Sequence, residues 1–153
     1  MKFATALFSA LMVAGSALAH PAEIHERDAP QIVNLKFHAG PAEYSLTIPA
    51  DGEKHYTNSD LAVDIIDTPD FNAYSQCTFY TAGEKVLAQS INTQTGLQSL
   101  VVGPPQPIIA VSCTGTCIYT YGDCYRNGQF LGTCCAGYCA ANKCRPWIAP
   151  GSN

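Results

Sequence analysis

Cysteine is the residue with the clearest chemistry in this chain. Eight of its 153 residues are cysteine, a density typical of small secreted proteins that disulfides hold together. Residues 20–112 contain one cysteine, Cys77, whereas residues 113–153 contain seven. An even number of cysteines in an oxidising compartment predicts four disulfides rather than metal ligands. We therefore expect a disulfide-dense C-terminal segment and no bound metal or cofactor.

Residues for catalysis are sparse in the sequence. It contains no G-x-S-x-G, H-E-x-x-H or phosphate-loop motif, so we expect no enzymatic activity. Asp60, Asp64, Asp67 and Asp70 lie close together in sequence and could bind calcium or serve acid–base chemistry. No glycine follows at the position that a calcium loop requires. We expect a solvated strand edge and turn here.

The first nineteen residues have the pattern of a signal peptide. Lys2 precedes an apolar run too short to span a bilayer, and Ala17-Leu18-Ala19 supplies the small-x-small cleavage pattern. We expect cleavage after Ala19, a flexible arm over residues 20–30, and secretion to the extracellular space. Cleavage would leave His20 as a terminal histidine that could chelate copper, as in lytic polysaccharide monooxygenases. Because Pro21 and a polar stretch follow it, we expect that His20 stands at this position by chance and binds no copper.

Charge is scarce and unevenly distributed. The chain is 47% hydrophobic and 13% charged, with a net charge of −4 and no basic run. This composition excludes a disordered polymer and a protein that binds nucleic acid by bulk charge. No second long apolar run follows the first one, so we expect no stable membrane insertion. Residues 20–112 hold four Lys and Arg against eleven Asp and Glu, whereas residues 113–153 hold three against one. A domain boundary near Cys113 follows.

Residues 31–113 have the alternating pattern of β-strands. Val33, Leu35 and Phe37 alternate with polar residues, and so do Val63 and Ile65 with their neighbours. We expect the residues of each set to share one face of a strand. The same pattern and the turn signals between the runs predict strands at 33–37, 44–48, 54–57, 61–65, 77–81, 85–91, 99–102 and 108–113.

Eight short strands without sustained helical periodicity predict an all-β fold. We expect an antiparallel β-sandwich or small barrel, followed by a small disulfide-rich module over residues 114–148 and a tail over 149–153. Residues 67–70 could start a short helical turn. The proline-rich segment 103–107 should be extended. Asn127-Gly128 predicts a type I′ hairpin turn.

The cysteine spacing from Cys117 is C-x6-C-x9-CC-x3-C-x4-C. Six cysteines allow fifteen pairings, but this spacing resembles the inhibitor cystine knot, or knottin. The resemblance implies a threaded module, and it leaves Cys77 to pair with Cys113. The knottin pairs that it implies are Cys117–Cys135, Cys124–Cys139 and Cys134–Cys144.

The whole layout is similar to the small secreted cysteine-rich proteins of filamentous fungi, many of which are candidate effectors. The signal peptide, the acidic β-region and the passage from Gly103 to Cys113 carry this likeness. It implies a protein secreted toward a host or competitor, and it assigns no catalytic residue.

Rigid loops that bear Tyr, Trp and Arg make good binding surfaces, because ordering them costs little. We expect exposure above all for the three tyrosines of the module's first half. Phe130 and Trp147 could instead cover the knot or dock it on the β-region. The candidate binding residues are Tyr119, Tyr121, Tyr125, Arg126, Phe130, Arg145 and Trp147.

Three functional classes compete. The first is an effector-type protein that binds an extracellular or host protein. The second is a knottin-type inhibitor of a secreted hydrolase; loop 118–123 has no Lys or Arg, which disfavours trypsin, whereas Tyr119 or Tyr121 would suit a chymotrypsin-like pocket. The third is a carbohydrate-binding module, although the spacing does not match the hevein pattern.

Overall fold

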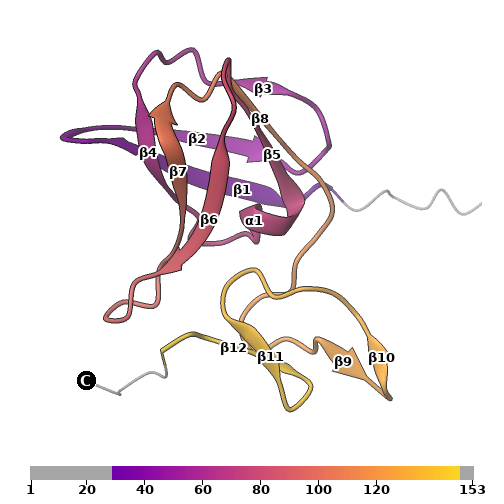
Figure 1. The fold of residues 1–153 in the computed structure, drawn as a ribbon. Helices are drawn as coiled ribbons and strands as arrows, with labels where there is room; N and C mark the ends of the chain where they lie inside the picture. The colour runs from indigo at the N-terminus through magenta and orange to yellow at the C-terminus, as the bar shows by residue number, and fades with distance from the viewer. Residues whose placement is uncertain (1–28, 149–153) are drawn as a thin grey trace, which may run out of the picture.

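Two antiparallel sheets form the N-terminal part of the protein, shown by a computed structural model that describes residues 29–148 (Figure 1). One sheet has the strand order β2-β1-β4-β7-β6, and the other has the order β3-β8-β5. The strands of the first sheet are β1 (Ile32–Ala39), β2 (Ala42–Pro49), β4 (Val63–Asp67), β6 (Val86–Ile91) and β7 (Gln98–Gln106). Those of the second sheet are β3 (His55–Tyr56), β5 (Cys77–Tyr80) and β8 (Ala110–Cys113).

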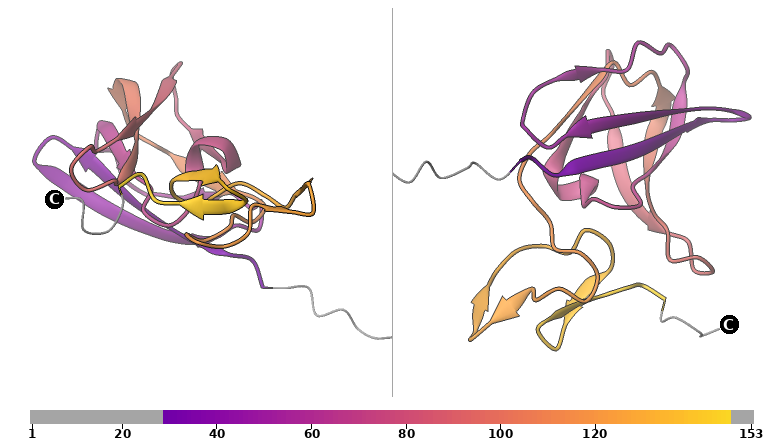
Figure 2. Two further views of the ribbon diagram at one scale, coloured as in Figure 1. Left: turned by 90° about the horizontal axis from the view of Figure 1, so that it is seen from below. Right: turned by 180° about the vertical axis from the view of Figure 1, so that it is seen from behind.

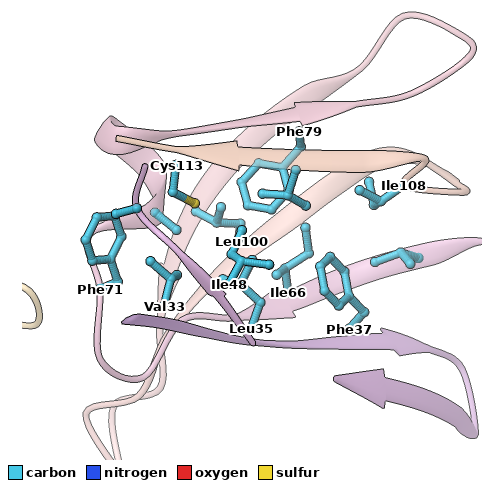
Figure 3. Packing of buried hydrophobic residues seen from close by; sticks show 14 of the residues in the cluster. Val33, Leu35, Phe37, Ile48, Ile66, Phe71, Phe79, Leu100, Ile108 and Cys113 are labelled. Atoms are coloured by element: carbon cyan, nitrogen blue, oxygen red, sulfur yellow. The ribbon is translucent and has the colours of Figure 1, made fainter. Parts of the chain in front are cut away.

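The core lies between these two sheets (Figure 3). Val33, Leu35 and Phe37 project into it from β1, while Phe79 and Val111 project from β5 and β8. All five side chains are buried, because alternate residues of a strand point to the same face. The expectation of an all-β, antiparallel fold is confirmed. We call residues 31–113 the β-module.

The face assignment of β4 differs from the expected one. Val63 and Ile66 are buried, whereas Ile65 is 39% exposed. The register between β4 and β7 shifts between Val63, which faces Gln106, and Ile65, which faces Val101. The bypassed part of β7 contains two prolines, which lack the N–H that a regular ladder requires. Simple alternation therefore fails here, and the prediction that Val63 and Ile65 share one face of a strand is wrong.

Two connecting segments also have defined structure. The helical turn is α1 (Ala73–Gln76), so it begins after residues 67–70 rather than within them. Phe71, which is fully buried, anchors the chain just before it. Residues 103–106 are extended as expected, and they belong to β7, where Gln106 pairs with Val63.

A disulfide between Cys77 and Cys113 joins β5 to β8. The two residues are directly opposite in the sheet register, with Cα atoms 4.1 Å apart. This is the pair that the knottin resemblance leaves over. The bridge fixes the end of β8 from which the chain leaves the β-module.

Residues 114–148, which we call the cystine module, follow directly. They contain two short hairpins, which lie beside one end of the β-module (Figures 1 and 2). Their strands are β9 (Tyr125–Arg126), β10 (Gln129–Phe130), β11 (Tyr138–Ala140) and β12 (Lys143–Arg145). Among the described residues, no helix is long and apolar enough to cross a membrane. The expected signal peptide, residues 20–28 of the arm and the tail lie outside the described residues.

Candidate interaction surface on the cystine module

Three disulfides hold the cystine module together. They are Cys117–Cys135, Cys124–Cys139 and Cys134–Cys144, the pairs that the knottin resemblance implies. The sulfurs of Cys124, Cys134 and Cys144 lie within 4.8 Å of one another, so the second and third bridges meet. Ile118 packs on this small sulfur core. Because all eight cysteines are oxidised, none is a thiolate that could ligate a metal.

Both hairpins of the module turn through two residues with positive φ. Asn127 and Gly128 have φ of 52° and 78°, as a type I′ turn requires, and they join β9 to β10 as predicted. Ala141 and Asn142 do the same between β11 and β12, with φ of 48° and 65°. These tight reversals set the short loops of the module.

The loop 118–123 contains a β-turn. The Gly122 amide donates to the Tyr119 carbonyl at 2.9 Å. Tyr121 occupies the third turn position with φ of 71°, where glycine or asparagine is usual. Its amide donates to the Cys144 carbonyl at 2.7 Å. The turn is therefore fastened to β12, and it carries a tyrosine at its tip.

Four aromatic side chains of this half of the module are exposed, and we call them the aromatic set: Tyr119, Tyr121, Tyr125 and Phe130. Tyr119 is 62% exposed, and Tyr121 and Phe130 are each 50% exposed. Tyr125 and Phe130 are paired across the β9–β10 hairpin, with ring centroids 5.1 Å apart. Such pairs hold each other's orientation.

Asp123 pairs with two of the three basic residues of the module. It accepts hydrogen bonds from the Lys143 ammonium and from Arg126 Nη2, the latter at 3.1 Å. The Lys143 ammonium and, less strongly, the Arg126 guanidinium hold the pKa of the Asp123 carboxyl below its usual range. The Arg126 side chain is still 67% exposed. Arg145 is half-buried, and it forms no ion pair with any residue from 29 to 148.

Trp147 lies at the joint between the two modules. Its Nε1–H donates to Gln98 Oε1 at 2.8 Å, and its ring packs against Tyr138 at 5.4 Å. Gln98 is buried; it also accepts from the Gly137 amide at 3.2 Å and donates to the Cys135 carbonyl at 3.0 Å. Trp147 therefore docks the cystine module, whereas Phe130 remains exposed.

Two further glutamines complete the joint. Gln31 Oε1 accepts from the Cys117 amide at 2.9 Å, and Gln76 Nε2 donates to the Thr116 carbonyl at 2.9 Å. Sequence reasoning missed Gln31, Gln76 and Gln98, since nothing distinguishes them from surface glutamines. It also gave no binding role to Tyr138, which is 47% exposed.

The four aspartates from Asp60 to Asp70 form no group of three that could hold a metal ion, among the described residues. Asp67 contacts His38 and Ser99, whereas Asp70 accepts from Asn34, so these two aspartates make separate contacts. Within residues 29–148, the one metal-type grouping consists of disulfide cysteines. His20, on which the copper hypothesis depends, lies outside the described residues.

Comparison with known proteins gives no relative. No protein-family model, no curated protein and no solved structure matches this chain.

Proposed function

We propose that this chain is a secreted effector-type protein that binds and modulates a protein of a host or competitor. The observation that carries the proposal is the aromatic set, displayed on a module held by three disulfides. Four disulfides fit an oxidising, extracellular compartment. The proposed binding residues are the aromatic set together with Arg126 and Arg145.

Physical chemistry supports a protein partner. Aromatic and arginine side chains dominate the binding energy of many protein interfaces. Held on short, bridged loops, they lose little conformational entropy on binding. Several large aromatic rings exposed to water lower the solubility of a protein. An interface with a partner would bury these rings. Trp147 serves this surface indirectly, because it fixes the module against the β-module.

The inhibitor alternative gains less support from the loop geometry. A substrate-like inhibitor presents an extended segment that can pair with the edge of a protease cleft. The tip of loop 118–123 is instead a tight turn with Tyr121 at positive φ. A carbohydrate-binding role would use the same exposed rings.

Affinity capture with the oxidised full chain tests the proposal. A triple variant, Tyr119→Ala, Tyr125→Ala and Phe130→Ala, should lose the captured partner, with at least a hundredfold weaker binding once that partner is purified. The matched control is Tyr56→Ala, since Tyr56 is 60% exposed on the β-module. The control should bind as the unmodified chain does.

Two other outcomes would replace the proposal. Inhibition of a serine or cysteine protease that the triple variant loses would favour the inhibitor class. Retention on chitin or cellulose that the triple variant loses would favour the carbohydrate-binding class. Equal partner binding by the triple variant and the Tyr56 control would sink a role for the aromatic set.

A further inference from the structure

A groove crosses the outer face of the five-stranded sheet, opposite the core. Its volume is about 500 Å³, and strands β1, β4, β6 and β7 all contribute to its lining. This volume falls within the range of small-ligand sites. The side chains on which the argument depends are His38, Asp64, Ile65, Asp67, Ser99 and Val101.

One part of the groove is a fixed polar network. Asp67 accepts from Ser99 Oγ at 2.7 Å, and its other oxygen lies 2.8 Å from His38 Nε2. His38 Nδ1 lies 3.7 Å from Glu43 Oε2. Both ring nitrogens therefore face carboxylates. The two hydrogen-bond contacts of Asp67 hold this part of the groove wall in place.

Asp64 carries the uncompensated charge of the groove. Its side chain lines the groove and is partly exposed, and no described cation pairs with it. Lys36, a neighbour on this face, pairs with Glu43 at 2.9 Å. The surroundings are also acidic, since residues 29–112 hold three Lys and Arg against eight Asp and Glu. A cationic ligand is therefore favoured.

Another part of the wall is aliphatic. Ile65 and Val101 are opposite one another in the register of β4 and β7, and they are 39% and 43% exposed. None of the described residues that line the groove is aromatic, so they offer no flat ring on which a sugar would stack. An aliphatic strip beside a carboxylate matches a side chain with an apolar stem and a charged head.

We propose that this groove binds a lysine or arginine side chain of a basic segment in a partner protein. The stem lies over Ile65 and Val101, and the cationic head meets Asp64. The site is separate from the aromatic set, and it does not depend on the function proposed above.

Titration calorimetry of the oxidised full chain with tetra-arginine amide tests this site. The neutral isostere tetra-citrulline amide is the ligand control. We expect the arginine peptide to bind with an affinity that falls as salt rises and that drops at least tenfold in Asp64→Asn. The matched control Asp60→Asn removes the same charge at an exposed position outside the groove, and it should change affinity less than twofold.

A second variant keeps the test independent of any folding defect in Asp64→Asn. Val101→Arg places a cation in the groove from an exposed strand position and should abolish peptide binding. Equal binding of the citrulline peptide, unchanged affinity in Asp64→Asn, or no binding at millimolar peptide would overturn the proposal. So would a dimer of the free chain that Val101→Arg disrupts, because the occupant would then be a second copy. Binding should persist in the aromatic triple variant, which separates failure here from failure of the proposed function.

Discussion

Tyr121 is a large side chain kept at a backbone position that disfavours it. Its φ of 71° is left-handed, a conformation that costs a non-glycine residue roughly 1–2 kcal/mol. Strain of this kind concentrates at functional sites. The exposed ring at the tip of the turn is consistent with a role in contact rather than in folding.

Replacing Tyr121 should separate stability from binding. Tyr121→Gly should be about 0.5–1 kcal/mol more stable than Tyr121→Ala, because glycine adopts positive φ without strain. Both variants should bind the partner more weakly than the unmodified chain. Guanidinium unfolding followed by Trp147 fluorescence measures the first effect. Equal stability of the two variants would contradict the strain argument.

Gly137 has no room for a side chain. An added Cβ would lie 1.8 Å from the Arg145 carbonyl oxygen. We expect Gly137→Ala to prevent the β11–β12 hairpin from closing, which would yield mixed disulfides on oxidative refolding. Peptide mapping without reduction measures this. Gly128→Ala is the control, since φ there is 78° but no atom lies within 4 Å; it should refold with the native pairs at a cost of about 1 kcal/mol.

At the scale of elements, Gln98 joins β7 to the cystine module. Gln98→Ala would leave the Cys135 carbonyl, the Gly137 amide and Trp147 Nε1–H without their partner. We expect a loss of about 2–3 kcal/mol, with faster hydrogen exchange at the Gly137 amide and a changed Trp147 emission. The control Gln94→Ala, at an exposed position, should change none of these three quantities. Unchanged exchange in Gln98→Ala would show that other contacts maintain the joint.

Asp123 gives the hairpins of the module a dependence on pH. Its pKa is lower in the folded state, so its contribution to stability is present above its unfolded pKa and is lost as pH falls through the folded value. We expect the module to lose stability below about pH 4. Asp123→Asn should flatten this part of the stability profile, measured by thermal unfolding across pH. A profile identical to that of the unmodified chain would refute the assignment.

Local patterns predicted most of the elements but not their deviations. Alternation located β1 and β2, and Asn127-Gly128 located the β9–β10 turn, because these depend on neighbouring residues alone. The exposure of Ile65 depends on a register shift against a distant strand, and the role of Gln98 depends on which backbone groups meet it. Neither follows from periodicity. The disulfide pairs followed from a family resemblance rather than from spacing.

For the whole molecule, the two modules should differ in their need for disulfides. The β-module has a continuous apolar core, whereas the sulfur core of the cystine module holds three half-cystines and Ile118. Replacing Cys124, Cys134, Cys139 and Cys144 with serine should unfold residues 118–146 and leave the β-module folded. Hydrogen exchange by mass spectrometry distinguishes the modules. Protection retained in residues 118–146 would contradict this division.

The hydrogen bonds of Gln31 and Gln98 between the two modules affect the affinity for a partner that contacts both modules. Gln98 and Gln31 tie backbone groups of one module to side chains of the other, so the aromatic set and the acidic groove keep a constant separation. A partner that reaches both would meet the second at a high effective concentration after engaging the first. Two contacts that are weak individually would then give the partner a long residence time. Loosening the hydrogen bonds between the modules would shorten that residence time without changing either binding site.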